Sequence, residues 1–538
     1  MNKVASYLNQ YISGNVFDKD SILDAYSTDR SIFKIKPRFV ALPENTKDVS
    51  RILTFLNQLA LKNYKLPISV RGSGLDKTGA DLTNGMLISM EKMNHIKEID
   101  PRSRLVRVEA GVTLGQLNSA LALHGLSVSI NTHPDHTIGG IIANCQVDSF
   151  ASKYGGIIKH IERLEIILSN GDRLQTIKIN HKKVEQLKSG KTFEGKIYKN
   201  IDNLLSEQKQ AIAGLSNSSY DSSGYPAITC IKTGKDFDLA PLFLASQGTL
   251  GIISEVILRC DVMPAPSRHL LVTFDSISKA IEFLQFSLSL RPAEASIYDM
   301  RIFEKSEEYG KKLKFITKKP IDDGFLVVVN FNDGQKKNSK NFSLCLEHLP
   351  RRSNFFVEDK ENQIYLKELI GALNNYLNSD ARGERIGFLD DFYIPADELS
   401  SFMDDLARIE KSFKVTLPLF GSFATENYYV RPDIKLEMLM PKKDEDDKAI
   451  EPLIISLIRV FNEVILRHKG SFTGGSPEGR SKALVTTPAM GSERRELYRK
   501  VKEIFDPNNI LNPDIKIGVD QKQVIKSLRT SYDDHIVI

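Results

Sequence analysis

Cysteine is scarce in this sequence: only four occur among 538 residues, at positions 145, 230, 260 and 345. Their wide spacing excludes zinc or redox motifs of the CxxC kind, and it excludes cysteine runs that bind iron–sulfur clusters. So few cysteines are typical of a reducing compartment, and we therefore expect a cytoplasmic location.

Long apolar runs and blocks of like charge are absent as well. No uninterrupted apolar stretch reaches the roughly 18 residues that cross a bilayer, and the first ten residues lack the apolar core of a signal peptide. The 73 basic and 68 acidic side chains leave a net charge of only +5, and the charged run 442–448 mixes both signs. We expect no transmembrane segment and no nucleic-acid partner, whereas peripheral contact with the inner face of a membrane stays open.

The composition is that of a globular protein with more than one lobe. Hydrophobic residues make up 41% of the chain and charged residues 26%. A single core stops growing at roughly 250–300 residues, so this chain needs at least two. Changes in composition and in the apolar pattern along the sequence predict four parts. They are a helical N-terminal segment over 1–36, an α/β block over 37–266, an α+β domain over 267–470 and a C-terminal segment over 471–538.

Apolar periodicity and turn residues predict the elements of these parts. In the α/β block, strands are expected over 38–42, 68–70, 85–90, 105–110 and 248–258, with helices that begin after Thr46 and Thr113 as N-caps. Asn170 and Gly171 supply a hairpin turn within 165–174, and the polar residues 177–240 are predicted to be an excursion. Further strands are expected over 270–274 and 325–329, and a helix over 493–505.

Two glycine-rich loops follow elements of the α/β block. Residues 71–79 have the sequence RGSGLDKTG, and residues 137–144 have the sequence TIGGIIAN. Glycine lacks a Cβ, so it lets backbone N–H groups converge on an anion. Neither loop is a Walker A or a GxGxxG motif. Because two such loops occur on successive α/β units, we predict that one diphosphate-bearing ligand spans both.

Several segments occur in an order that is typical of one family. They are 37–43 (PRFVALP), 71–79, 109–113 (EAGVT), 137–140 (TIGG), 153–156 (KYGG), 246–253 (SQGTLGII) and, near the C-terminus, 506–513 (DPNNILNP). Over about Tyr26 to Gly518 this set resembles the vanillyl-alcohol oxidase/PCMH-type flavoproteins. The resemblance implies an α+β fold with a two-subdomain PCMH-type FAD-binding domain, an α+β substrate (cap) domain and a C-terminal segment that returns to the FAD domain.

The same resemblance implies that FAD is the cofactor. The implied contacts are Arg71, Gly72, Ser73, Gly74, Leu75, Gly79, Thr137, Ile138, Gly139, Gly140, Asn144, Tyr154, Gly155, Gly248 and Ile253. Some relatives attach the flavin covalently through a histidine where this chain has Leu75. Cys145 lies near a second attachment point, but we expect it to be a buried structural cysteine. Noncovalent FAD is therefore predicted.

Residues 293–299 and 391–395 are similar to the branch of D-lactate dehydrogenases and the glycolate oxidase large subunit. That branch carries Gly-His-x-Gly-Asp-Gly-Asn-x-His, whose histidines bind a divalent metal, and Ser-Gly-Glu-His-Gly-Ile-Gly, which supplies an acidic ligand and a general-base histidine. Here Ser422 and Tyr429 stand in place of the metal-binding histidines, and Gly475 and Ser476 in place of the acid and the base. Because hydroxyl groups are poor ligands for zinc or manganese, we predict no metal.

The candidates for catalysis are side chains near these replaced positions. Tyr429, Tyr428 and Glu426 lie on the matched strand, and Arg480 on the returning loop is expected to clamp a carboxylate. The predicted activity is oxidation of a small hydroxy acid or related alcohol by hydride transfer to flavin N5, after which electrons pass to oxygen, a quinone or a partner protein. A sugar or aldonolactone oxidase, and a flavin-binding protein that has lost catalysis, stay open as alternatives.

Overall fold

The chain begins with a small sheet whose inner strands are parallel. In the computed structural model, which describes residues 2–215, 221–304, 324–350, 354–358, 371, 373, 387–432 and 453–529, the strand order is β1-β2-β4-β3. β2 (Phe39–Leu42) and β4 (Met86–Ser89) are buried along their whole length, as expected of parallel strands covered on both faces. β3 (Ile68–Arg71) also runs parallel to β4, and β1 (Asn15–Phe17) adds an antiparallel edge.

The N-terminal segment is helical only in part. α1 (Lys3–Tyr11) and α2 (Asp20–Ala25) agree with the predicted helices, but β1 between them joins the first sheet. α3 (Thr46–Leu61) links β2 to β3 and buries its apolar stripe. Its N-cap is Asn45, whose side chain accepts a hydrogen bond from Asp48 N at 3.1 Å, and not Thr46 as the sequence predicted.

The second sheet of this half is antiparallel and has the order β5-β6-β13-β8-β9. Its strands are β5 (Ile96–Asp100), β6 (Leu105–Glu109), β13 (Ile252–Arg259), β8 (Ile161–Ile167) and β9 (Arg173–Gln175). The helices beside it are α4 (Leu114–Ala122), α5 (Ile138–Asn144), α6 (Ala151–Tyr154) and α7 (Ile157–His160), and β7 (Leu126–Ser127) pairs with β14 (Asp261–Val262). Thr113 caps α4 through a capping box, which confirms that prediction.

The polar stretch after β9 is an excursion with its own elements, as predicted. It contains β10 (Ile179–Asn180), α8 (His181–Lys188), α9 (Phe193–Glu207), α10 (Lys209–Leu215), β11 (Lys232–Thr233) and β12 (Asp236–Phe237), with 3₁₀ turns over Pro226–Cys230 and Ala240–Phe243. Its apolar side chains join the core of the two sheets, so the excursion is part of the same half of the molecule.

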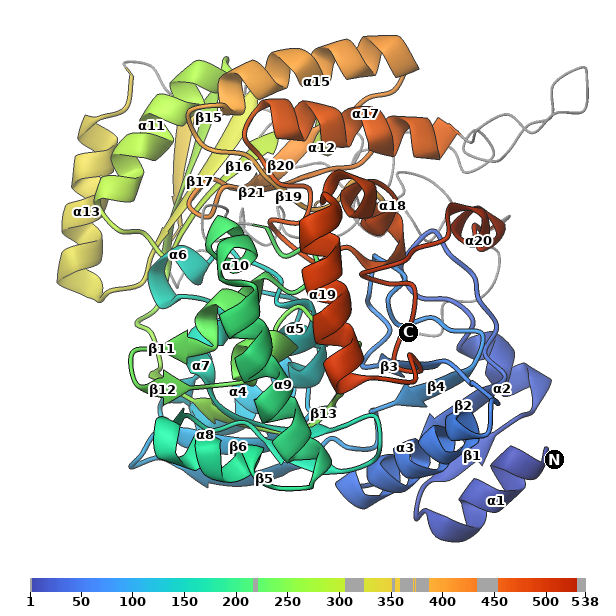
Figure 1. Ribbon diagram of the computed structural model, residues 1–538. Coiled ribbons are helices and arrows are strands. Elements are labelled where there is room, and N and C mark those ends of the chain that lie inside the picture. Colours follow the sequence, from blue (N-terminus) through green and yellow to red (C-terminus); the bar gives the residue numbers. More distant parts are fainter. Residues whose placement is uncertain are drawn as a thin grey trace, which may run out of the picture.

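The cap is an antiparallel sheet with helices on one face (Figure 1). Its strand order is β18 (Asn354–Glu358), β15 (Arg268–Phe274), β17 (Phe325–Phe331), β16 (Glu294–Asp299), β20 (Leu419–Ser422), β21 (Asn427–Val430) and β19 (Phe392–Tyr393). α11 (Ile277–Ser289), α13 (Gln335–Glu347), α15 (Leu399–Phe413) and α17 (Leu453–Arg467) cover that face, and short α12 (Arg301–Glu304) follows β16. The other face, the inner face, carries Tyr298, Phe420 and Tyr429 in a separate apolar cluster.

The C-terminal segment returns to the first half, as predicted. α18 (Gly479–Ala489) is followed by α19 (Ser492–Phe505), which packs beside α9, and by α20 (Gln521–Lys526). Leu511 bridges Ile68 next to β3, and Asn512 Nδ2 donates to Ala80 O at 2.7 Å and to Gln247 O at 2.7 Å. Every helix of the described residues is too short or too polar to cross a bilayer.

Candidate active site

The two glycine-rich loops lie against each other. A Cβ added at Gly72 of the first loop would stand 2.2 Å from Oγ1 of Thr137 in the second. Gly74 and Gly79 have φ values of +70° and +74°, a left-handed conformation that glycine adopts without strain. The two loops are therefore close enough for one ligand to span both, while the predicted contact of that ligand, FAD, with each residue stays a prediction.

The first loop presents backbone donors next to a hydroxyl group. Among the residues that the structure describes, the N–H groups of Ser73, Gly74 and Leu75 meet no acceptor. Thr137 lies beside them at the start of α5, and its Oγ1 accepts a hydrogen bond from Gly140 N at 3.2 Å. Consecutive N–H groups without a protein partner, beside glycines that leave room, fit the diphosphate of FAD.

The side chain of Arg71 turns away from this surface. Its Nη1 donates to Thr28 O at 2.8 Å, and its Nε lies 3.6 Å from Asp81 Oδ2. The guanidinium therefore packs behind the loop, where a Cβ at Gly74 would come within 2.2 Å of it. This placement gives Arg71 a role in shaping the loop, and Gly74 a second reason to be glycine.

Asn144 and Gln247 hold the two loops in register. Asn144 Nδ2 donates to Asp76 Oδ1 at 3.4 Å, and Gln247 Nε2 donates to Asn144 Oδ1 at 3.3 Å and to Thr78 Oγ1 at 3.2 Å. Gly479 N in turn donates to Gln247 Oε1 at 3.0 Å, which ties the C-terminal segment to the same point. Gln247 was missed as a site residue, although it belongs to the 246–253 motif.

Other predicted cofactor contacts are explained at least partly by packing. Ile138 and Ile253 are buried in the core of the first half. A Cβ at Gly139 would stand 2.8 Å from that of Ala110, so the helix can approach β6 only with glycine here. Gly248 has a φ of +72° and lies beside β3.

Tyr154 and Gly155 lie where the FAD domain meets the cap. The Tyr154 hydroxyl donates to Asn332 Oδ1 at 3.0 Å, and Lys153 Nζ lies 2.9 Å from Asp333 Oδ1. Gly155 follows with a φ of +86°. These contacts join the two halves beside the end of β17.

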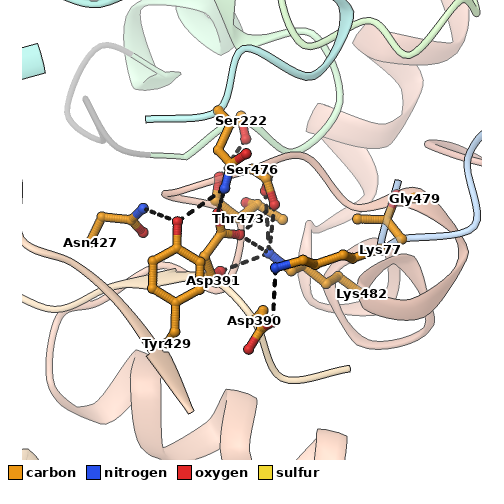
Figure 2. A network of polar contacts seen from close by, with 12 residues as sticks. Lys77, Ser222, Asp390, Asp391, Asn427, Tyr429, Thr473, Ser476, Gly479 and Lys482 are labelled. Atoms are coloured by element: carbon orange, nitrogen blue, oxygen red, sulfur yellow. Dashed lines mark hydrogen bonds and ion pairs between the residues drawn. The ribbon is translucent and has the colours of Figure 1, made fainter. Parts of the chain in front are cut away.

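Tyr429 and Ser476, two of the replaced positions, belong to one polar network on the inner face (Figure 2). Gln146, which follows the second glycine loop, donates from Nε2 to Asp391 Oδ2 at 3.2 Å and to the Tyr429 hydroxyl at 3.0 Å. Ser476 Oγ donates to Asp391 Oδ1. The network therefore contains groups from the FAD domain, from β21 and from the returning loop.

A buried ammonium group lies at the centre of this network. Lys482 is fully buried, and its Nζ donates to Asp391 O at 2.7 Å, to Asp391 Oδ1 at 3.0 Å and to Ser476 Oγ at 3.2 Å. Burial favours the neutral form of Asp391, but Lys482 and the Ser476 hydroxyl outweigh it and hold the pKa of this carboxyl below its usual value. Asp391 is therefore an anion paired with a cation. Neither Lys482 nor Asp391 was predicted as a site residue.

Tyr429 is the predicted catalytic residue that does reach the network. Its ring stacks on Phe420 with 5.2 Å between centroids, and Asn427 Nδ2 lies 3.5 Å from its hydroxyl. Burial, with Asp391 nearby, raises the pKa of Tyr429 well above its usual value. The phenol therefore stays protonated near neutral pH and acts as a hydrogen-bond donor, so it is not suited to accept a proton from a substrate.

Tyr428 and Glu426 lie elsewhere. Successive residues of a strand point to opposite faces, so Tyr428 packs against Phe392 in the core between the sheet and its helices. Glu426 stands in the turn before β21, where its Oε1 accepts a hydrogen bond from Ala396 N at 2.8 Å. The structure does not bring either side chain to the network.

Arg480 faces the cofactor loop from behind. Its Nε donates to Gly79 O at 3.1 Å and its Nη2 to Leu82 O at 2.8 Å. The guanidinium therefore supports the backbone of the first loop and is not placed as a clamp for a substrate carboxylate.

The replaced positions do not fit a divalent metal. A Cβ at Gly475 would stand 2.2 Å from Asn427 Oδ1 and 2.7 Å from Asp391 Cγ, so no acidic side chain can be accommodated there without displacing both. Ser422 Oγ accepts a hydrogen bond from Thr425 N at 3.3 Å. Since the Asp391 carboxylate is already neutralised by Lys482, the remaining hydroxyl and amide groups are a poor ligand set for a metal ion.

The cysteine nearest the second loop is also unsuited to attach a flavin. Burial, with a contribution from Asp148, raises the pKa of Cys145 to about 11. The residue is thus a thiol near neutral pH, whereas the nucleophilic form is the thiolate. This agrees with the predicted noncovalent FAD.

Comparison with known proteins identifies both halves. Residues 37–176 match the family model described as FAD binding domain, and residues 263–515 match the model of the C-terminal domain of FAD linked oxidases.

Three relatives illustrate the likeness along the sequence. D-2-hydroxyglutarate dehydrogenase of Pantoea ananatis is 27% identical over 549 residues, which cover 95% of this chain and 51% of that protein. The Escherichia coli protein of the same name is 26% identical, with 90% and 49% covered. The chain thus spans about half the length of these relatives. Glycolate oxidase subunit GlcD of Bacillus subtilis is 23% identical, with 92% of both chains covered.

Solved structures share the fold at lower identity. A 4-ethylphenol oxidase from Gulosibacter chungangensis superposes with a TM-score of 0.67 at 14% identity over 97% of both chains. An alkyldihydroxyacetonephosphate synthase gives a TM-score of 0.63 at 16% identity over 95% of this chain and 84% of that one. With an FAD binding domain over 37–176 followed by the C-terminal domain of FAD linked oxidases over 263–515, this chain belongs to the FAD-linked oxidases.

Proposed function

We propose that this protein oxidises a small hydroxy acid to the corresponding oxo acid with FAD as cofactor and without a metal ion. The named activities of the sequence relatives, dehydrogenation of D-2-hydroxyglutarate and oxidation of glycolate, support this substrate class. The poor fit of a metal ion to the replaced positions Ser422, Tyr429, Gly475 and Ser476 separates this chain from the motif pattern of the branch that it resembles.

One observation carries the proposal. Gln146 ends the segment that contains the second glycine loop, and it is hydrogen-bonded to Asp391 and Tyr429 on the inner face of the cap. A polar, ion-paired network therefore lies at the junction of the cofactor-binding surface and the cap. Small-molecule sites in enzymes commonly lie at such domain junctions, with a few polar groups in fixed positions.

The chemistry is divided between cofactor and protein. When bound, FAD supplies the hydride acceptor at flavin N5. The protein must accept the hydroxyl proton of the substrate, so that loss of the hydride and the proton converts C–OH to C=O. Ser476 stands at the position of the base, and its hydroxyl donates to the Asp391 carboxylate. We assign Asp391 as the final proton acceptor. The substrate hydroxyl gives its proton to the Ser476 oxygen while Ser476 passes its own proton to Asp391.

The compartment and the electron acceptor are part of the proposal. Cys145, Cys230, Cys260 and Cys345 are all free thiols, which supports a reducing compartment such as the cytoplasm. Reoxidation of the reduced protein by oxygen, by a soluble quinone and by a cell extract will identify the class of acceptor.

The test is anaerobic reduction of the flavin. Purified FAD-loaded protein, dialysed against EDTA, is mixed with D-2-hydroxyglutarate, D-lactate, glycolate, an aldonolactone or a sugar, and loss of the flavin absorbance is followed. We expect a hydroxy acid to bleach the flavin, and Asp391→Asn to slow the bleaching by about 10²–10⁴-fold. Bleaching only by the sugar or lactone, or by nothing in the panel, would overturn the proposal.

A further inference from the structure

The direction of the Tyr429 hydroxyl proton follows from the partners of Gln146. Asp391 is ionised, and a carboxylate can only accept hydrogen bonds. The atom of Gln146 that lies 3.2 Å from Asp391 Oδ2 must therefore be the amide nitrogen. Because the same nitrogen lies 3.0 Å from the Tyr429 oxygen, its second hydrogen is directed to Tyr429.

Asn427 approaches Tyr429 in the same sense. Its Nδ2 lies 3.2 Å from Val147 O, an acceptor, which fixes the orientation of this amide as well. The same nitrogen is 3.5 Å from the Tyr429 oxygen. Both side chains that contact the hydroxyl oxygen thus offer hydrogens to it, and among the described residues no acceptor receives the proton of Tyr429.

A cation from the first glycine loop lies near the Tyr429 ring. Lys77, from the first glycine loop, has its ammonium 5.8 Å from the centroid of the Tyr429 ring and 3.5 Å from Asp390 Oδ2, and about a third of its side chain is exposed. Figure 2 shows Lys77 and Tyr429 on either side of Asp390 and Asp391. An O–H group that donates to no described acceptor, with an ammonium group 5.8 Å from the centroid of its ring, suits an anionic oxygen.

We propose that Tyr429 recognises the carboxylate of the substrate by donating its hydroxyl proton, and that Gln146 is a positioning residue that keeps this proton from turning inward. Lys77 adds positive charge to the same subsite. Ser476, which hydrogen-bonds to Asp391 in the same network, would then contact the substrate hydroxyl. A molecule with a carboxylate and a hydroxyl on adjacent carbons would meet both groups, so this inference rests on the proposed function and adds the residues that select its substrate class.

The positioning role has a specific consequence. Replacing Gln146 by leucine leaves Asp391 Oδ2 without its donor, and the Tyr429 hydroxyl is then expected to rotate and donate to that carboxylate. This proton is then no longer available for a hydrogen bond to the substrate, although Tyr429 itself is unchanged. Gln146→Leu should therefore imitate Tyr429→Phe, and the two changes together should cost no more than one alone.

Binding of oxalate tests this without turnover. Oxalate carries carboxylates but no oxidisable C–H bond, and its Kd is read from the perturbed visible spectrum of the FAD-loaded protein. We expect the Kd to rise about 10- to 100-fold in Tyr429→Phe, in Gln146→Leu and in the double variant alike. Tyr428→Phe, the same chemical change on the opposite face of the strand, should leave the Kd as it is.

The outcomes separate the two proposals. An unchanged Kd in Tyr429→Phe, additive losses in the double variant, or no oxalate binding by the unmodified protein would each overturn the carboxylate assignment. If oxalate binds through Tyr429 but no hydroxy acid bleaches the flavin, the proposed function fails while the subsite stands. If a hydroxy acid bleaches the flavin and Tyr429→Phe has the same KM, only the subsite fails.

Discussion

Replacing Lys482 by methionine will remove the positive charge that pairs with Asp391 inside the network. The ammonium is fully buried and lies 3.0 Å from Asp391 Oδ1, and the carboxylate side chain is 3% exposed. Breaking a buried ion pair by removing one partner costs about 3–5 kcal/mol, because the other charge stays buried without compensation. With about 2–4 °C per kcal/mol for domains of 150–250 residues, we expect the melting temperature to fall by about 6–20 °C.

The loss of stability must depend on pH in a defined direction. In the unmodified protein the pKa of Asp391 lies below its ordinary value of 3.8, so the group is ionised in both the folded and the unfolded chain above about pH 5. In Lys482→Met, burial alone raises the folded pKa above the unfolded one. The loss of stability relative to the unmodified protein is then largest at pH values above that raised pKa. It becomes smaller as the pH falls and the folded variant takes up a proton at Asp391.

The assay is the melting temperature of FAD-loaded protein between pH 5 and pH 8, for both the variant and the unmodified chain. Lys516→Met is the matched control, because Lys516 Nζ lies 2.6 Å from Glu478 Oε2 and both side chains are fully buried. The Lys516→Met variant should show a comparable fall in melting temperature, but its Kd for oxalate should equal that of the unmodified protein. A loss below about 2 °C for Lys482→Met, or a deficit that grows toward pH 5, would refute the reasoning.

Other predictions address the cofactor and the metal. Gly72→Ala should weaken FAD binding by at least about tenfold, measured by flavin fluorescence after dialysis, because its Cβ would meet Thr137 Oγ1 at 2.2 Å, whereas Gly214→Ala, with nothing within 4 Å, should have no effect. Trichloroacetic acid should release all flavin into the supernatant, and Cys145→Ser should bind FAD as before; flavin that stays with the precipitate would contradict the noncovalent assignment. Gly475→Glu should lower the melting temperature without creating a response of turnover to zinc or manganese, and a metal-stimulated rate would show that the site can be rebuilt.

The two glycine-rich loops could be predicted from the sequence because each is recognised from residues that are adjacent along the chain. A glycine run after a strand is a backbone property, and the loops at 71–79 and 137–140 lie together as the spacing of the α/β units suggested. Their supports could not be read in this way. Arg480 and Gln247 reach the first loop from distant parts of the chain, and even the 246–253 motif that contains Gln247 does not indicate which loop this side chain contacts.

The catalytic side chains show the same limit more strongly. Tyr428 and Tyr429 are equivalent in the sequence, and only the strand register decides that one enters the core and the other the inner face. Lys482 and Asp391 are 91 positions apart, and Gln146 and Asp391 are 245 apart. A pattern of degenerate metal ligands indicated where the network would lie, but the ion pair that fills the place became visible only in three dimensions.

The contact between the C-terminal segment and the first glycine-rich loop has a consequence for the synthesis of the protein. Asn512, which holds Ala80, is 432 positions further along the chain. At about 5–20 residues per second, synthesis leaves the glycine loop without this support for about 20–90 s after it emerges. Capture of the flavin is therefore expected only once Asn512 has left the ribosome, and nascent chains that stop short of this asparagine should carry no flavin.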